Sequence, residues 1–90
     1  MQFEKDELLR QAKEHLKEEM TAISYSTWIE NLEIAEITDT QMVLIVQSVF
    51  QKELLEARYL ELIVNVFKFI TNKTFDISIK LVENNNSTSQ

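Results

Sequence analysis

The chain has 90 residues, which suits one domain with a single modest core. It has no cysteine, glycine or proline, which excludes a disulfide framework, a thiolate metal site, a cysteine nucleophile and a glycine-rich phosphate-binding loop from this sequence. Its net charge of −6 disfavours tight nucleic-acid binding, because that affinity comes largely from Lys and Arg side chains that neutralise phosphates, and favours protein partners.

Two helices are predicted in the first third of the sequence. Residues 3–20 carry apolar side chains at spacings of three and four, and Leu8 widens this stripe. The stripe consists of Leu9, Ala12, Leu16 and Met20, with Ile23 continuing the row. A short second helix is expected to run from a cap at Ser24 or Ser26 through Asn31. Its apolar positions are Tyr25, Trp28, Ile29 and Leu32.

Strand-like patterns follow in the middle of the chain. Residues 32–37 form a weak strand pattern, and residues 38–40 are the most plausible hairpin turn, built from Thr and Asp without glycine. Residues 42–46 are a continuous β-favouring run. Such a run predicts a strand covered on both faces, or nearly so.

A long helical pattern opens at Ser48. Ser48 and Gln51 have the spacing of a capping box, in which each side chain satisfies a free backbone N–H of the first turn. A break is expected near Ala57, and the helix is expected to stop at Asn72. The apolar row is Leu55, Tyr59, Leu62, Ile63, Val66 and Ile70. The core assignment covers Tyr59, Leu62, Ile63 and Val66.

The last pattern is the clearest strand, because residues 75–81 alternate apolar and polar side chains. Residues 1–82 are therefore predicted to form one compact α+β domain in the order α-α-β-β-α-β, with helices packed on a small three-stranded sheet. Residues 83–90 are predicted to be a disordered tail or the start of a linker.

Catalytic chemistry finds no support in the sequence. His15 is the only histidine, and no second residue stands at the spacing that a metal site or catalytic dyad needs. We predict no catalytic, metal-binding or cofactor-binding residues, and no enzyme. No apolar run approaches the roughly 20 residues that span a bilayer. A cytoplasmic protein without a membrane partner is therefore expected.

Beyond these patterns, the sequence resembles the N-terminal domain of DnaA, the bacterial replication initiator. Residues 24–29 (SYSTWI) are similar to the family's F-x-x-W-[ILM] segment, and residues 48–60 are similar to its N-x-F…[KR]-Y-[L] segment. There are departures: Gln47 and Ser48 replace the usual Pro-Asn, and Leu9 stands where the family often carries a tryptophan used in self-association.

The resemblance implies a KH-like fold and a non-catalytic interaction module. Such a module self-associates, recruits the replicative helicase DnaB, docks small regulators of initiation and makes weak contacts with single-stranded DNA. The implied partner-binding residues are Ser24, Thr27, Trp28, Ser48 and Phe50. The implied self-association residues are Leu8, Leu9 and Ala12, with at most weak association because the tryptophan is missing.

The residues by themselves leave other interpretations open. Large aromatics are usually mostly buried, so the residues alone favour Trp28 and Phe50 as core aromatics, and only the resemblance brings partner binding level with that interpretation. Ser24 and Ser48 are alternatively interpreted as helix caps. Leu8 is expected to be the most exposed of the self-association set, because it lies off the main stripe. In the implied fold, the starts of the second helix and of the long helix lie close together and bring Trp28 and Phe50 onto one patch.

Two other functions remain as alternatives. The first is a free-standing KH-like nucleic-acid-binding module, against which the acidic charge and the missing GXXG loop argue. The second is a stand-alone mimic of the initiator domain that sequesters its partners, and the sequence leaves this one open.

Overall fold

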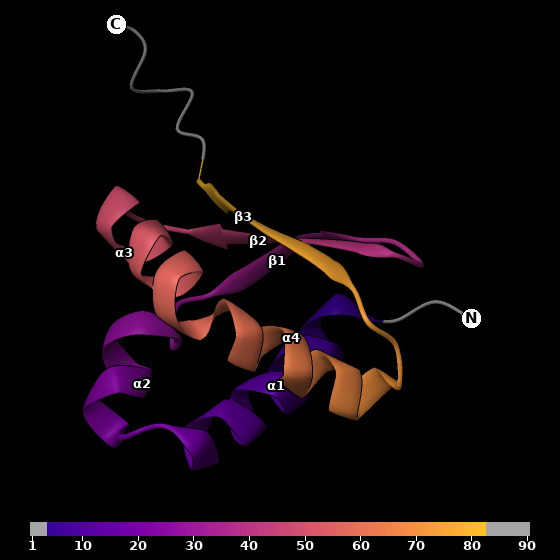
Figure 1. The fold of residues 1–90 in the computed structure, drawn as a ribbon, viewed down its shortest axis with the longest axis horizontal. Helices are drawn as coiled ribbons and strands as arrows, with labels where there is room; N and C mark the ends of the chain where they lie inside the picture. The colour runs from indigo at the N-terminus through magenta and orange to yellow at the C-terminus, as the bar shows by residue number, and fades with distance from the viewer. Residues whose placement is uncertain (1–3, 83–90) are drawn as a thin grey trace, which may run out of the picture.

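The computed structural model describes residues 4–82 and has the predicted order of elements (Figure 1). The elements are α1 (Lys5–Glu19), α2 (Ala22–Trp28), β1 (Glu33–Ile37), β2 (Gln41–Val46), α3 (Val49–Leu54), the π-helical turn η1 (Leu55–Tyr59), α4 (Leu60–Thr71) and β3 (Asp76–Leu81). The last three helical elements follow one another without a loop, and the break expected near Ala57 is η1. Residues 83–90 lie outside the described residues.

The three strands form one sheet in the order β1-β2-β3. β2 pairs antiparallel with β1 and parallel with β3. The hairpin between β1 and β2 closes without glycine, because the Thr38 hydroxyl accepts hydrogen bonds from the backbone N–H groups of Thr40 (3.3 Å) and Gln41 (3.0 Å). The predicted turn at residues 38–40 is thereby confirmed.

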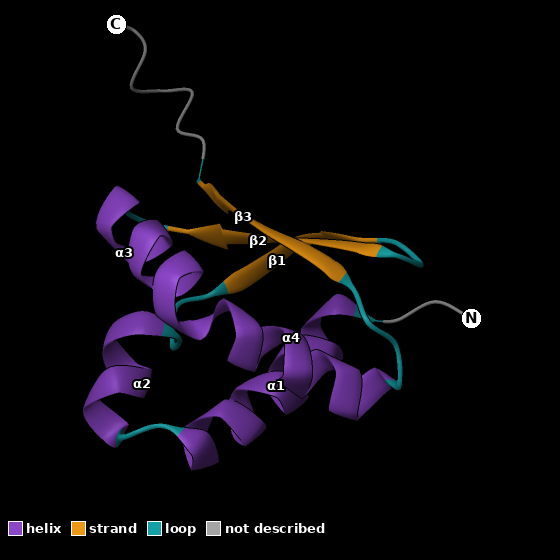
Figure 2. Ribbon diagram, viewed as in Figure 1, coloured by secondary structure: helices purple, strands orange, loops and turns teal. Residues whose placement is uncertain are grey.

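The helices lie on one side of the sheet or at its end, so the domain has two layers (Figure 2). Met42, Leu44 and Val46 of β2 are buried towards the helices, whereas Val43 and Ile45 are half-buried. The prediction that residues 42–46 are covered on both faces, or nearly so, therefore holds in full for the side that faces the helices, while the other side is only partly covered. An unbroken apolar run hides the alternation of a strand, because every position is apolar whichever face it occupies.

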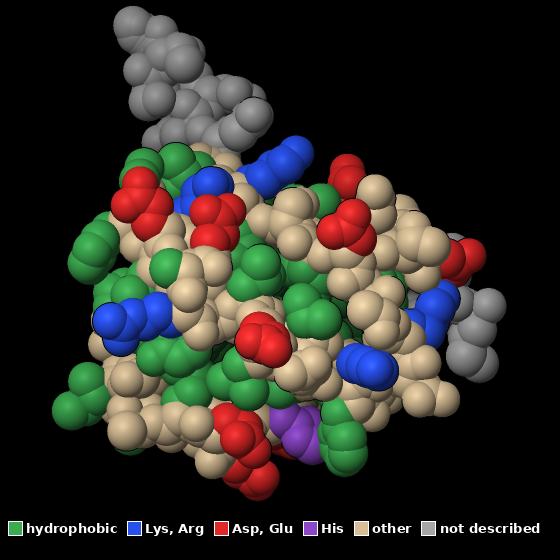
Figure 3. Space-filling view, in the orientation of Figure 1, with side chains coloured by type: hydrophobic (Ala, Val, Ile, Leu, Met, Phe, Trp, Pro, Cys, Tyr) green, Lys and Arg blue, Asp and Glu red, His purple; other side chains and the backbone are tan. Residues whose placement is uncertain are grey.

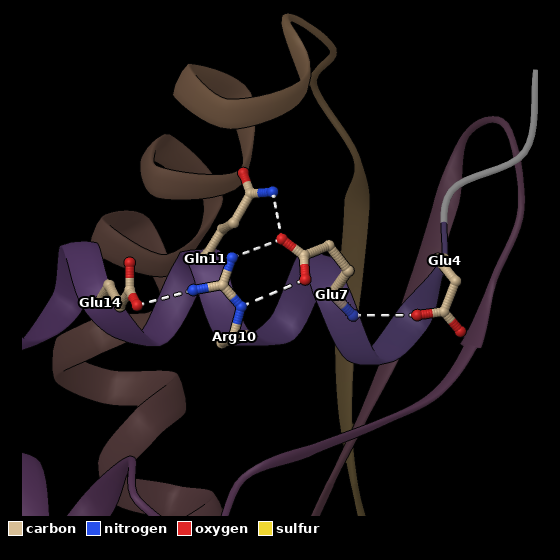
Figure 4. A network of polar contacts seen from close by, with 5 residues as sticks. All are labelled: Glu4, Glu7, Arg10, Gln11 and Glu14. Carbon is tan, nitrogen blue, oxygen red and sulfur yellow. Dashed lines mark hydrogen bonds and ion pairs between the residues drawn. The ribbon is translucent and has the colours of Figure 1, made fainter.

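Helix α1 buries Leu8, Ala12 and Leu16, which recur every four residues and face the core. Leu9 is only half-buried, so Leu8 takes its place in the expected stripe, whereas the core positions of Ala12 and Leu16 are confirmed. The exposed side of α1 carries polar contacts (Figure 4). Arg10 lies between Glu7 and Glu14, while Glu7 also accepts a hydrogen bond from Gln11 at 2.9 Å.

The long helical segment packs Leu55, Ile63, Val66 and Phe67 into the core. Phe67 is among the largest fully buried side chains, and the sequence pattern missed it. Two residues assigned to the core, Tyr59 and Leu62, are only half-buried, because the π-helical turn shifts the phase of the helix. α4 stops at Asn72 as predicted: this residue adopts a left-handed conformation (φ 63°), and its N–H donates to Lys68 O at 2.7 Å.

Candidate interaction surface at the junction of two helix ends

The C-terminal end of α2 meets the N-terminal end of α3. Ser48 caps α3, and its hydroxyl accepts a hydrogen bond from the N–H of Gln51 at 3.1 Å. The Gln51 side chain then donates from Nε2 to the carbonyl of Trp28, the last residue of α2, at 2.8 Å. Its Oε1 accepts from the N–H of Gln47 at 3.2 Å, one residue earlier than a capping box requires.

The expectation that two helix starts meet here is wrong. Helix α2 begins two residues before Ser24, and Thr21 is its cap, with a hydroxyl that accepts the N–H of Ser24 at 3.1 Å. Neither Ser24 nor Ser26 is the cap. Thr21, Ser24 and Ser26 all lie within six positions, and each type of side chain can cap a helix. The spacing of the apolar residues did not show which of the three is the cap.

The junction brings Trp28 and Phe50 together. Their ring centroids lie 5.6 Å apart at an interplanar angle of 65°, an edge-to-face arrangement that aromatic rings prefer. Phe50 is 68% exposed and Trp28 is half-buried. Phe50 is therefore not a core residue. It sits in the first turn of α3, outside the apolar row of the long helix.

Hydroxyl residues lie close to the pair in the sequence. Ser24 is half-buried one helical turn before Trp28, while Thr27 and Ser48 are exposed. Val49, which the sequence interpretation missed, is 53% exposed. Val49 directly precedes Phe50. Two successive apolar residues at the start of the long helix, outside its apolar row, could have indicated in the sequence that both side chains are exposed. We call the set Ser24, Thr27, Trp28, Ser48, Val49 and Phe50 the Trp28–Phe50 surface.

This part of the molecule exposes the apolar side chains of Ile23, Val49 and Phe50 among polar ones. Hydrophobic side chains gather on the side where α2 and α3 lie (Figure 3). Tyr25, one turn before Trp28, is buried, and burial together with the nearby carboxylate of Glu30 raises the pKa of its phenol. The residues present can supply apolar contact area and hydroxyl hydrogen bonds. No group of three or more His, Cys, Asp or Glu side chains placed to hold a metal occurs within residues 4–82.

The residues assigned to self-association lie elsewhere. Leu8 and Ala12 are buried in the core, at 5% and 1% exposure, so the expectation that Leu8 is the most exposed of the three is wrong. Leu9 is half-buried and lines an open groove of about 740 Å³ between α1 and β1. In that groove Lys13 donates to the carbonyl of Glu30 at 2.8 Å, and burial lowers the pKa of its ammonium group.

Fold and surface together define a small α+β domain with an exposed aromatic pair at the junction of two helix ends. Residues 6–68 match the family model of the DnaA N-terminal domain. The chain is also 30% identical over 73 residues to the chromosomal replication initiator protein DnaA of Geotalea daltonii. The chain therefore belongs to the DnaA N-terminal domain family, as its sequence motifs suggested.

The matches cover most of this chain but only a small part of the relative. The alignment with the Geotalea daltonii initiator includes 81% of this chain but only 16% of that protein. The family match takes in both helix ends of the Trp28–Phe50 surface and stops before β3. None of the helices within residues 4–82 combines the length and the apolar character that crossing a bilayer requires.

Proposed function

We propose that this domain is a non-catalytic protein-interaction module of a bacterial replication initiator, and that the Trp28–Phe50 surface docks the replicative helicase DnaB and small regulators of initiation. Membership of the DnaA N-terminal domain family supports the link to initiation. The helicase and regulators are the partners that the resemblance to the family implies.

The exposure of Phe50 carries the assignment of the surface. A phenyl ring that is 68% exposed leaves apolar area in contact with water, and burying that area against a partner is favourable. The ring is held edge-on to Trp28, so it loses little freedom when a partner covers it. Apolar anchors within a polar rim, here Thr27 and Ser48, have the usual anatomy of a protein interface.

Other contacts are proposed to be minor. The net charge of −6 works against the phosphate neutralisation that nucleic-acid affinity needs, so binding of single-stranded DNA is expected to be weak or absent. Self-association is also expected to be weak. Of the three residues assigned to it, Leu9 is the one with appreciable exposed area.

A matched pair of phenylalanine variants tests the proposal. Phe50→Ala should weaken binding of purified DnaB helicase by roughly 1–4 kcal/mol, the range expected for an interface hot spot. Phe69→Ala is the control, because Phe69 is similarly exposed, at 75%, but belongs to α4. It should leave the affinity unchanged. Titration with labelled domain, followed by fluorescence anisotropy, measures both.

The experiment distinguishes three outcomes. Helicase binding that is weakened by Phe50→Ala alone, in a folded domain, supports the Trp28–Phe50 surface as the docking site. Equal affinities for the unmodified domain and a folded Phe50→Ala variant would remove Phe50 from the site, and an unmodified domain that binds neither helicase nor a regulator would contradict the proposed function.

A further inference from the structure

Gln51 is a buried polar residue in the core, with an exposure of 7%. A buried amide is costly unless its polar atoms find partners. Both polar atoms of the Gln51 side chain have one: Nε2 donates to Trp28 O and Oε1 accepts from Gln47 N–H. Its own backbone N–H is held by Ser48. Such a residue is fixed in position by its surroundings.

The bond to Trp28 spans the two elements that form the surface. The carbonyl groups of the last helical turn have no partners within their own helix, and Gln51 supplies a donor to the one at Trp28. Within residues 4–82, α2 and α3 are joined by this hydrogen bond and by the contact between the rings of Trp28 and Phe50. The link from Gln51 therefore contributes much of the directional contact between α2 and α3.

Phe50 is the neighbour of Gln51 in the first turn of α3. Fixing the Gln51 side chain to Trp28 O fixes the main chain of Trp28 relative to that turn. With the two backbones held in this way, the rings lie within reach of each other and meet edge-to-face at 5.6 Å. An aromatic pair by itself favours the edge-to-face tilt of its rings but does not fix the backbone of one helix end against the other.

We infer that Gln51 is a positioning residue: its hydrogen bond to the carbonyl of Trp28 holds the end of α2 against the start of α3 and so presets the Trp28–Phe50 pair before any partner arrives. The identity of the partner that binds the preset pair depends on the proposed function. The positioning role of Gln51 does not depend on it. Presetting a contact surface lowers the entropy cost of binding.

Trp28 is the only tryptophan in the chain, so its fluorescence reports on this junction directly. Gln51→Met keeps the approximate length of the side chain and removes both polar atoms. Gln51→Glu keeps an acceptor for Gln47 N–H and removes the donor to Trp28 O. Both variants should alter the near-ultraviolet circular dichroism of Trp28 and increase its quenching by acrylamide. Amide hydrogen exchange at Ile29 and Glu30 should be about fivefold faster, the change expected when a local opening loses one hydrogen bond.

Leu62→Ala is the control for general destabilisation, because Leu62 is half-buried on α4, away from this junction. It should lower stability without changing the Trp28 signals or the exchange at Ile29 and Glu30 beyond the global effect. The Gln51→Glu result is decisive. If that variant is folded and its Trp28 signals match those of the unmodified domain, the positioning role is refuted, and a similar shift in Leu62→Ala would refute it equally. These measurements need no partner, so failure of the proposed function leaves them intact.

Discussion

The phenyl ring of Phe69 packs edge-on against the imidazole of His15, with ring centroids 5.0 Å apart, and joins α4 to α1. Although it has this contact, Phe69 is 75% exposed. Phe50 makes a similar edge-to-face contact with Trp28 at the other end of the helical segment. The domain thus displays two phenylalanines that are each in contact with an aromatic ring and mostly open to water, while Phe67 is buried.

The buried and exposed phenylalanines should differ sharply in their contribution to stability. Phe67→Ala removes a side chain that is 1% exposed and leaves a cavity, so we expect it to lower the free energy of unfolding by about 3–5 kcal/mol. Phe50→Ala should cost less than about 1.5 kcal/mol, the scale of one aromatic pair. Urea denaturation followed by far-ultraviolet circular dichroism measures both. Equal losses for the two variants would contradict the exposed placement of Phe50.

The start of α2 can be located by alanine substitution at the three hydroxyl residues. Thr21→Ala removes the side-chain oxygen that accepts the N–H of Ser24 and should cost about 0.5–2 kcal/mol. Ser24→Ala and Ser26→Ala should cost clearly less, because neither side chain caps the helix. Thermal unfolding of the three variants gives the ranking. A larger loss for Ser24→Ala than for Thr21→Ala would restore the start expected from the sequence.

Acid titration should identify the Glu7 carboxylate as unusually acidic. The guanidinium of Arg10 and the amide of Gln11 donate to it, which lowers its pKa from the ordinary value of 4.5 to about 2. Because the folded pKa lies below the unfolded one, this contact adds stability above about pH 4.5, and the contribution is lost as the pH falls towards about 2. The contribution is small, since the pair is exposed to solvent.

Two-dimensional NMR of the Glu7 side chain measures this pKa directly. Arg10→Gln should return it most of the way to 4.5, whereas Lys17→Gln, on the same helix, should leave it unchanged. A Glu7 pKa near 4.5 in the unmodified domain would show that the Arg10 contact is not populated in solution.

The oligomeric state follows from the burial of the first helix. With Leu8 and Ala12 in the core, a second copy could reach only the half-buried Leu9 among the residues assigned to self-association. We expect a monomer at micromolar concentration, with weak association at most, because no aromatic hot spot is present at these positions. Sedimentation velocity tests this, and Leu9→Asp should abolish any residual dimer. A tight dimer that survives Leu9→Asp would place the contact on another face.

Much of the fold was predictable because local patterns agree with it. The alternation at residues 75–81 predicted β3, and the αL-tolerant Asn72 predicted the end of α4. The sequence did not correctly predict which side of the first helix faces the core. Leu8 and Leu9 are adjacent apolar residues on one helix, and which of them faces the core depends on how α1 sits against α4, which no local pattern encodes.

The two aromatic residues of the candidate site could be predicted from the sequence. The hydrogen bond that joins the two helix ends beneath them could not. Motif order singled out Trp28 and Phe50, which the structure brings into contact. Gln51 was expected only as half of a capping box. Its main partner, Trp28 O, lies 23 residues away in the sequence, and a contact of that separation depends on the tertiary fold.

The pairing of β2 leaves one of its edges open until the last strand of the domain has been synthesised. β2 lies between β1 and β3, and its parallel partner β3 comes after the whole helical segment from α3 to α4. A chain that stopped at Lys68, where the family match ends, would leave one side of β2 with unpaired N–H and C=O groups beside the apolar side chains of Met42 and Leu44. Unpaired strand edges of this kind recruit strands from other chains. Until residues 76–81 have been synthesised, this edge of β2 therefore has no partner strand within its own chain.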